Sequence, residues 1–223
     1  MLSSSIDITH FNTCRESVSI EHVSAIPRTK NTHVFAICIT KDNKPIIAAR
    51  RSSFAFQEIM SKRTTPETTL IVPQKLLLYM YPNEIHEINR RLQKGNILLS
   101  NSNFEELILL GGKINKQESV NDCLIREIRE ESDAALTIKK IGSKSLKLTI
   151  YDKLFNKTYV SYCTTCYINE TLDIALQSRI YNVEIRNLKL LFDCINNDKY
   201  EYLTFIYNTL HLLNNDDDEF TSI

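Results

Sequence analysis

Runs of apolar residues separated by polar turns divide the chain into segments of strand and helix length. Residues 33–40 form a continuous apolar run, residues 41–45 supply turn residues, and residues 46–50 return as an apolar run, which predicts a β-hairpin. Further strands are predicted at 104–110, 146–150, 158–168 and 182–186. Helical spacing of apolar residues predicts helices at 57–63, 75–94, 119–131 and 200–213, with Pro82 dividing the second of them.

The order of these elements predicts an α/β fold in which helices cover the faces of a mixed sheet. The helical character of residues 57–103 interrupts the β-rich part, so we expect a core of residues 16–56 and 104–213 with a helical insertion at 57–103. Residues 1–15 carry little pattern and predict a loosely docked terminal extension. Residues 214–223 form the other extension, and their acidic run at 216–219 predicts a solvated tail.

Composition narrows the classes of partner. The formal net charge is zero, so no field of the whole molecule attracts nucleic acid; RNA binding would need a local basic patch, and we expect no DNA partner. The amino-terminal residues lack a signal-peptide pattern, and no apolar run approaches the roughly 18–20 residues that cross a bilayer, so we expect no membrane association. The six cysteines are scattered, which favours free thiols in a reducing compartment. No obligate protein partner is indicated.

The candidate chemistry is concentrated in one stretch. The chain has only four glycines, and Gly111 and Gly112 lie side by side between the apolar run 107–110 and the predicted helix 119–131. Five residues separate Gly112 from Glu118, and seven more separate Glu118 from Arg126. A strand that ends in two glycines and turns into a carboxylate-rich helix is typical of a site for phosphates and metal ions.

Three glutamates of this helix share one face. At about 100° per residue, Glu127, Glu130 and Glu131 fall within an arc of about 100° that continues the apolar stripe of Val120 and Leu124. Like charges at this spacing cost a few tenths of a kcal/mol each. A bound divalent cation offsets that cost, and hard oxygen ligands favour Mg²⁺ or Mn²⁺. The alternative is a solvated acidic helix face. Arg126 would orient the carboxylates, and Glu118 would support the loop.

The spacing resembles the Nudix box at every position up to Glu131, and it departs at the closing glycine, where this chain has Asp133. Asp tolerates the left-handed backbone of a helix end, so the departure is minor. Beyond the box, residues 15–210 resemble the poxvirus Nudix mRNA-decapping enzymes, most closely their shorter, early-expressed type. The stretches that carry this likeness are 31–36, 49–57, 104–113, 152–157 and 180–186.

The resemblance implies a Nudix α/β/α sandwich with a small inserted helical lobe, and a hydrolase that cuts the 5′ cap of mRNA. The products would be 7-methyl-GDP and RNA with a 5′ monophosphate. Such an enzyme would act in the cytoplasm of an infected cell, lower host and viral mRNA levels and promote host shutoff. Two alternatives stay open: a Nudix pyrophosphatase for a small nucleotide, and a catalytically silent cap- or RNA-binding Nudix protein.

The resemblance also implies roles for single residues. Glu127, Glu130 and Glu131 would bind the metal together with the backbone carbonyl of Gly112, and Glu184 is the candidate general base. A second group would bind the cap. Two rings, Phe54 and Tyr159, would stack on the cationic 7-methylguanine, and two carboxylates, Glu16 and Asp152, would accept its N–H groups. Apart from the resemblance, the adjacent pair Arg50 and Arg51 is the local basic candidate for contact with the triphosphate, and the alternative for Arg51 is a solvated strand end.

Weaker signals predict little chemistry. Cys163 and Cys166 have the spacing of a metal or redox pair, but a strand pattern places their thiols on opposite faces. The five histidines show no ligand spacing. Basic residues of the insertion would either follow the RNA body or form a solvated helix face: Lys75, Arg90, Arg91 and Lys94.

Overall fold

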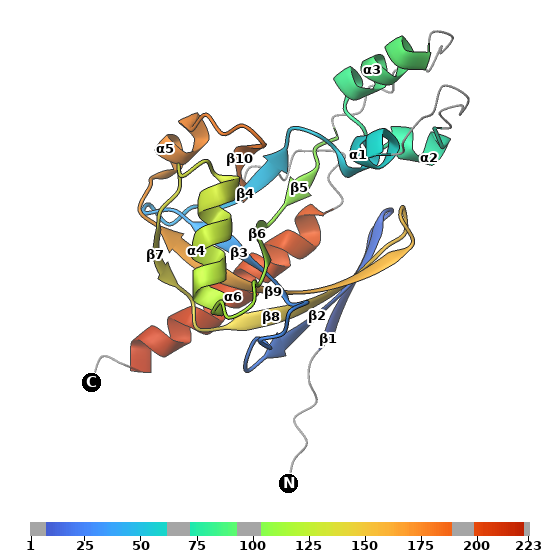
Figure 1. The fold of residues 1–223 in the computed structure, drawn as a ribbon. Coiled ribbons are helices and arrows are strands. Elements are labelled where there is room, and N and C mark those ends of the chain that lie inside the picture. The colour runs from blue at the N-terminus through green and yellow to red at the C-terminus, as the bar shows by residue number, and fades with distance from the viewer. Residues whose placement is uncertain (1–7, 62–71, 93–103, 189–198, 221–223) are drawn as a thin grey trace.

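The computed structural model describes residues 8–61, 72–92, 104–188 and 199–220, and of residues 215–220 it describes the backbone alone. Its centre is one mixed sheet (Figure 1). The main path of the sheet runs, in spatial order, through β1 (Ile8–Asn12), β2 (Glu16–Val23), β8 (Ser145–Asp152), β9 (Lys157–Ile168), β3 (His33–Ile39), β4 (Pro45–Arg50) and β10 (Val183–Asn187). Only the β3–β9 pair is parallel among the described strands. The three strands off this path are β5 (Leu107–Ile108) beside β4, β6 (Leu110–Lys113) beside β3, and β7 (Ile138–Ile141) beside β9.

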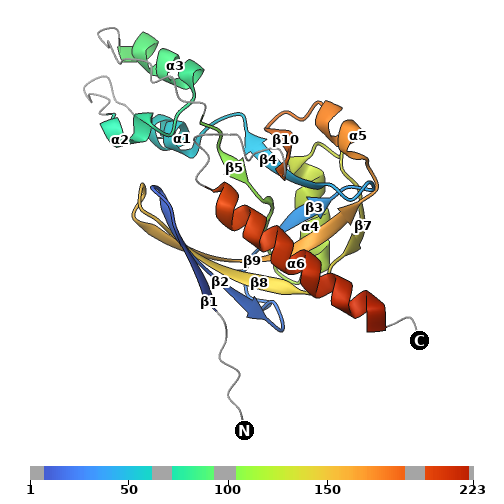
Figure 2. The same ribbon diagram turned by 180° about the vertical axis from the view of Figure 1, so that it is seen from behind.

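Helices lie on both faces of the sheet, as the two opposite views show (Figures 1 and 2). The helices are α1 (Phe54–Ser61), α2 (Gln74–Leu77), α3 (Pro82–Leu92), α4 (Val120–Glu131), α5 (Leu172–Gln177) and α6 (Tyr200–Phe220). The alternation of β3 supplies both cores, because successive side chains of a strand point to opposite faces. Val34 and Ala36 pack with Leu124 of α4, whereas Ile37 packs with Ile206 of α6. The sheet is therefore buried on both faces, which explains the continuous apolar runs of its central strands.

The hairpin of β3 and β4 opens toward residues 107–113, which include the two adjacent glycines. The two strands pair only next to their turn, at Cys38 with Ile46 and at Ile39 with Pro45. Farther along, β6 pairs with β3 and β5 pairs with β4, so the segment 107–113 fills the space between the separated strands. This arrangement places Gly111 opposite Phe35 and Gly112 opposite Val34.

The helices α1 to α3 share a small core of their own at one end of the molecule (Figure 1). Ala55 and Ile59 of α1 are buried there with Ile85 and Ile88 of α3. Leu154, from the turn between β8 and β9, joins the same cluster. The helical segment is thereby attached to the strand turn that follows Asp152.

Several expectations from the sequence are confirmed and others are corrected. The division of 75–94 at Pro82 is confirmed by α2 and α3, whereas α1 begins at Phe54, three residues before the predicted start. The prediction of a loosely docked terminus is wrong for residues 8–15, because β1 pairs with β2 and Phe11 packs 5.2 Å from the ring of Phe205 in α6. The helix α6 continues through the acidic run 216–219, which is therefore no separate tail.

The remaining outcomes concern one strand, the cysteine pair, the insertion and membrane crossing. The strand predicted at 104–110 is two short strands, and the second includes both glycines. Cys163 and Cys166 lie in the cores on opposite faces of the sheet, as the strand pattern predicts. Lys94 lies outside the described residues, as do all of residues 62–71 and 93–103 of the predicted insertion. No helix in the described ranges has the length and apolarity that crossing a membrane requires.

Candidate active site

The helix α4 is fixed by its cap and by its apolar face. Ser119 precedes its first turn and accepts the backbone N–H of Asp122, which satisfies a helix-end donor. Cys123, Leu124 and Ile128 are fully buried against the sheet. Glu127 lies within this anchored stretch of helix, directly before Ile128. The packing of α4 thus sets the backbone position of Glu127, and Arg126 holds its carboxylate.

The carboxylate of Glu131 is held against the glycine pair. Its Oε2 accepts the backbone N–H of Gly111 at 2.8 Å. Burial raises the pKa of Glu131 to about 7; Glu127 adds to this rise, while the Gly111 N–H and Arg50 oppose it. A carboxylate that is kept buried beside other carboxylates is unfavourable unless positive charge compensates it.

Arg126 joins the loop to the helix. Its guanidinium forms two bonds to Glu118, at 2.8 and 2.9 Å, and a third to Glu127 at 2.7 Å. It also reaches Glu130 at 3.3 Å and the carbonyl of Lys113 at 3.1 Å. The bonds from Arg126 to Glu118 are the main reason that the pKa of Glu118 is lowered to about 2. The arginine therefore orients two of the three candidate ligands and also closes the loop that precedes α4.

The two glycines leave no room for side chains. A Cβ on Gly111, whose φ is +139°, would lie 2.3 Å from the carbonyl oxygen of Val34. A Cβ on Gly112 would lie 2.4 Å from the carboxyl carbon of Glu127. The Glu127 carboxylate therefore occupies the space that a side chain at position 112 would need. Asp133, at the position of the missing glycine, has φ +49°, in the left-handed region that its place in the motif demands.

The donor set fits a hard divalent cation in its chemistry, since it consists of carboxylate and backbone oxygens. Among the described residues, however, no three acidic, histidine or cysteine side chains converge into a finished cation site. Glu127 and Glu130 turn to Arg126, and Glu131 turns to Gly111. Glu130, 61% exposed, lines an open depression of about 550 Å³ along the outer side of α4. Its carboxylate can therefore be reached from solvent.

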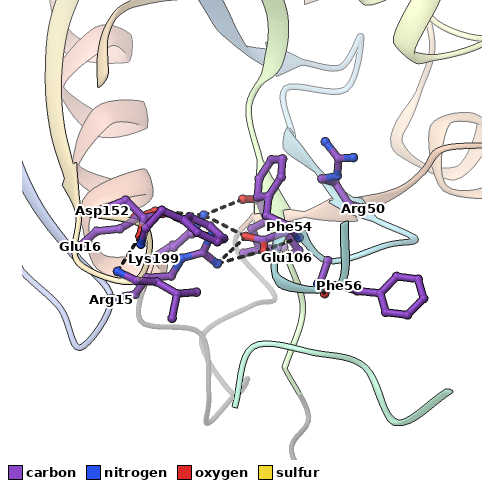
Figure 3. Close-up of polar contacts among 12 residues, drawn as sticks. Arg15, Glu16, Arg50, Phe54, Phe56, Glu106, Asp152 and Lys199 are labelled. Atoms are coloured by element: carbon purple, nitrogen blue, oxygen red, sulfur yellow. Dashed lines mark hydrogen bonds and ion pairs between the residues drawn. The ribbon is translucent and has the colours of Figure 1, made fainter. Parts of the chain in front are cut away.

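Arg50 connects this helix to the predicted cap residues. It ends β4, and its positive charge acts on Glu131. The carbon of its guanidinium lies 4.3 Å from the centroid of the Phe54 ring, a cation–π arrangement. Figure 3 shows the two side chains close together at the start of α1. Arg50 thus interacts both with Glu131, a candidate metal ligand, and with Phe54, a candidate for stacking on the cap base.

Three of the other cap candidates lie on one face of the sheet. The register pairs Glu16 with Asp152 across β2 and β8, and Ile150 with Tyr159 across β8 and β9. Asp152 and Ile150 are two residues apart, so all of these side chains share the face that α6 covers. Glu16 and Asp152 are each only 5% exposed, whereas Tyr159 is 47% exposed. In the described structure the rings of Tyr159 and Phe54 do not stack on each other.

The structure adds a buried charged cluster that the sequence does not reveal. Arg15, Glu106 and Lys199 are almost fully buried and lie between Phe54 and the carboxylates of Glu16 and Asp152 (Figure 3). They come from segments that lie about 90 residues apart in the sequence. No motif marks them. The one signal that the sequence offers is position: Arg15, Glu106 and Lys199 each stand directly before a strand or helix with buried apolar residues.

Glu184 lies on β10, opposite Ala49 of β4. Its carboxylate accepts bonds from Arg51 at 2.5 Å and from Arg186 at 2.7 Å. The bond from Arg186 is the main reason that the pKa of Glu184 lies below its ordinary value. Arg186 also binds Glu105 at 2.8 Å. The candidate base is therefore ionised and held at the edge of the sheet by two arginines.

Comparison with known proteins gives close relatives over nearly the whole chain. An mRNA-decapping protein of Rabbit fibroma virus (strain Kasza) is 58% identical over 203 residues, which cover 91% of this chain and 98% of the relative. An mRNA-decapping protein of Vaccinia virus (strain Copenhagen) is 56% identical over 200 residues, covering 90% and 93%. A Fowlpox virus (strain NVSL) protein named as a candidate Nudix hydrolase is 47% identical over 202 residues, covering 90% and 87%. No protein-family model matches the sequence.

Proposed function

Because the chain belongs to the poxvirus family of Nudix mRNA-decapping proteins, we propose that it hydrolyses the 5′ cap of mRNA and releases 7-methyl-GDP and RNA with a 5′ monophosphate. The observation that carries the chemistry is the row of carboxylates on α4, packed against the backbone of Gly111 and Gly112. Such a row would hold divalent cations, and these cations would neutralise negative charge on the phosphates. A module that only binds RNA has no use for it.

We propose that Glu127, Glu130 and Glu131, with the Gly112 carbonyl, hold Mg²⁺ or Mn²⁺. When bound, the cation neutralises phosphate oxygens and lowers the pKa of a water molecule. Arg126 keeps Glu127 and Glu130 on the substrate side of the helix through its bonds to both. The raised pKa of Glu131 supports this assignment, because a buried carboxylate beside Glu127 gains most from a cation.

Glu184 is the proposed general base. It is ionised at neutral pH, since Arg186 and Arg51 lower its pKa. Those bonds also make it a weaker base, so one of them must loosen before it accepts a proton. Arg51 is the half-exposed partner and lies next to Arg50 in the chain. A triphosphate that attracts Arg51 would release one oxygen of Glu184.

The cap base would bind between Phe54 and Tyr159, with Glu16 and Asp152 accepting its N–H groups. Two observations support this pocket. The face of the Phe54 ring already holds a planar cation, the guanidinium of Arg50. Glu16, Asp152 and Tyr159 come from three neighbouring strands yet share one face of the sheet. Because the two carboxylates are buried, their neighbouring side chains must shift when the base enters.

The finer architecture is part of the proposal. We assign the core to a Nudix α/β/α sandwich and the helices α1 to α3 to a lobe inserted at residues 57–103, with α1 extending back to Phe54. The separate small core of these helices supports the assignment. Decapping in the cytoplasm of an infected cell would shorten the life of host and viral transcripts. Lys75, however, donates to the carbonyl of Leu154, and Arg90 and Arg91 pair with Glu87, so nothing in these contacts favours RNA binding over a solvated face.

Cap-labelled RNA incubated with the protein and Mg²⁺ or Mn²⁺ tests the proposal, with Glu130→Gln as the matched inactive variant. We expect 7-methyl-GDP as the labelled product from the wild type and none from the variant. Equal turnover of the free cap dinucleotide and of a long capped RNA would favour a small-molecule pyrophosphatase instead. Binding of capped RNA without any product would indicate a silent binding protein.

A further inference from the structure

Glu106 is the most deeply buried acid among the described residues, with 0% of its surface exposed. It lies directly before β5, in the segment that fills the opening between β3 and β4. A lone carboxylate at such a position would be strongly destabilising. Its charge must therefore be compensated by neighbours, and the identity of those neighbours shows what the residue connects.

Glu106 has three partners that come from distant segments. Both of its oxygens bind one guanidinium nitrogen of Arg15 at 2.9 Å. Lys199, at the start of α6, lies 3.2 Å from Oε1. The backbone N–H of Phe54 donates to Oε2 at 3.3 Å. One carboxylate thus joins the amino-terminal strands, the first turn of α1 and the helix on the far face of the sheet (Figure 3).

The two cations that bind Glu106 continue to the proposed cap carboxylates. Arg15 also reaches Asp152 at 3.4 Å, and Lys199 also reaches Glu16 at 3.3 Å. Glu106 is consequently one contact away from Phe54 and two contacts away from Glu16 and from Asp152.

Within the five residues Arg15, Glu16, Glu106, Asp152 and Lys199, the formal charges do not cancel. Glu16, Glu106 and Asp152 contribute three negative charges, and Arg15 and Lys199 contribute two positive charges, which leaves one negative charge in excess. Burial acts to raise the pKa of Glu106, but Lys199 and Arg15 outweigh it and hold the pKa below its ordinary value. For Lys199 the balance is reversed, since Glu16 and Glu106 outweigh burial and raise its pKa. Glu106 and Lys199 therefore stay charged at neutral pH.

We propose that Glu106 is a positioning residue for cap selection, which places Phe54 relative to Glu16 and Asp152 and supplies the excess negative charge that favours a cationic, methylated base. This inference rests on the proposed function, because it concerns the same pocket. In a buried cluster an uncompensated charge acts with little screening, so it discriminates between a cationic and a neutral base of nearly the same shape. A purely structural role would lower the affinity for both bases alike.

Equilibrium binding of 7-methyl-GDP and of GDP separates these two roles. Glu106→Gln keeps the size of the side chain and sets the charge of the cluster to zero. We expect the preference for 7-methyl-GDP to fall roughly tenfold, which corresponds to about 1.4 kcal/mol. With capped RNA, the KM should rise by a similar factor while kcat changes less than about threefold, since the groups on α4 are untouched.

A double variant makes the charge effect visible even if the single variant is poorly folded. Glu106→Gln with Lys199→Met removes one charge of each sign, so the cluster again carries one negative charge in excess. We expect the double variant to regain most of the preference, although it lacks more native contacts. Lys199→Met alone increases the negative charge and should keep the preference.

Glu21→Gln is the matched control, because Glu21 lies on the same strand as Glu16 but pairs with Lys147, away from the pocket. It should leave both affinities unchanged. A wild-type protein without preference for 7-methyl-GDP would refute the proposed cap pocket itself. A wild-type preference that persists in folded Glu106→Gln would refute the role of Glu106 alone. A double variant with less preference than Glu106→Gln would also overturn the charge argument.

Discussion

Replacing the two adjacent glycines by alanine should affect different properties of the protein: Gly111→Ala mainly its stability, and Gly112→Ala mainly its activity. In Gly111→Ala the new Cβ would lie 2.3 Å from the carbonyl oxygen of Val34 and 2.7 Å from the Cα of Phe35. Both atoms belong to the backbone of a central strand, which has little freedom to move. In Gly112→Ala the three atoms nearest to the new Cβ would be those of the Glu127 carboxylate, at 2.4–2.5 Å, which is the end of a flexible side chain.

The magnitudes follow from these contacts. The φ of +139° at Gly111 is strained for any other residue at about 1–3 kcal/mol. The steric overlap adds about 1–3 kcal/mol. We therefore expect Gly111→Ala to lower the free energy of unfolding by about 3 kcal/mol or more. Gly112→Ala should lower it by only about 1 kcal/mol, the cost of moving Glu127 to another rotamer.

Activity should show the opposite contrast. Gly112→Ala displaces the carboxylate that Arg126 orients, so kcat/KM for capped RNA should fall about 10- to 100-fold, the range typical of disturbed metal ligands. The concentration of Mn²⁺ needed for half-maximal activity should rise with it. Folded Gly111→Ala should keep a larger share of its activity per folded molecule. Urea unfolding and single-turnover cleavage measure the two quantities. Wild-type kcat/KM in Gly112→Ala would exclude the proposed role of the Glu127 carboxylate, and wild-type stability in Gly111→Ala would exclude the expected clash with β3.

Three further predictions concern the pocket, the base and the buried acid. Tyr159→Ala should change the free energy of unfolding by less than about 0.5 kcal/mol, because the ring is half exposed. In calorimetric titrations, both Tyr159→Ala and Phe54→Ala should nevertheless weaken the preference for 7-methyl-GDP. Full preference in both variants would contradict the assignment of the two rings. If Glu184 is the base, its lowered pKa keeps it ionised to below pH 4.5. Arg186→Gln removes the main cause of this lowering, so the acid limb of the pH profile of kcat/KM should move to higher pH. An acid limb at the wild-type pH would exclude Glu184 as the base. Because the pKa of Glu106 is lower in the folded protein than in the unfolded chain, the ionised carboxylate stabilises the fold above about pH 4.5, and this stabilisation is lost as the pH falls. The Tm should therefore decrease below about pH 4.5, and it should decrease less steeply in Glu106→Gln. Parallel curves of Tm against pH for the two proteins would contradict this.

The local pattern of the sequence was sufficient for the helix and loop that carry the chemistry. The face of α4 follows from the period of the helix, and Arg126, Glu118 and Glu127 are close enough in sequence for their contacts to be foreseen. The strand β2 was missed although its signal is present. Val18 and Ile20 alternate with serines, and the polar half of this alternation conceals a buried strand.

The buried cluster was beyond sequence reasoning for a physical reason. Arg15 and Glu106 meet across 91 positions and Lys199 and Glu106 across 93, so their pairing depends on how the strands order in the sheet. A single charged residue has no period from which its burial can be read. The same holds for Glu16 and Asp152, whose proximity follows from the register of β2 and β8 and not from their neighbours in the chain.

We propose that the chemistry resides on α4 and that cap selection resides on the opposite face of the sheet. One experiment tests it directly: binding and single-turnover cleavage of the same capped RNA by Glu130→Gln and by Tyr159→Ala. We expect Glu130→Gln to bind with nearly wild-type affinity and to yield no 7-methyl-GDP. Tyr159→Ala should bind more weakly and cleave at nearly the wild-type rate once saturated. Loss of affinity in Glu130→Gln together with unchanged affinity in Tyr159→Ala would contradict the account.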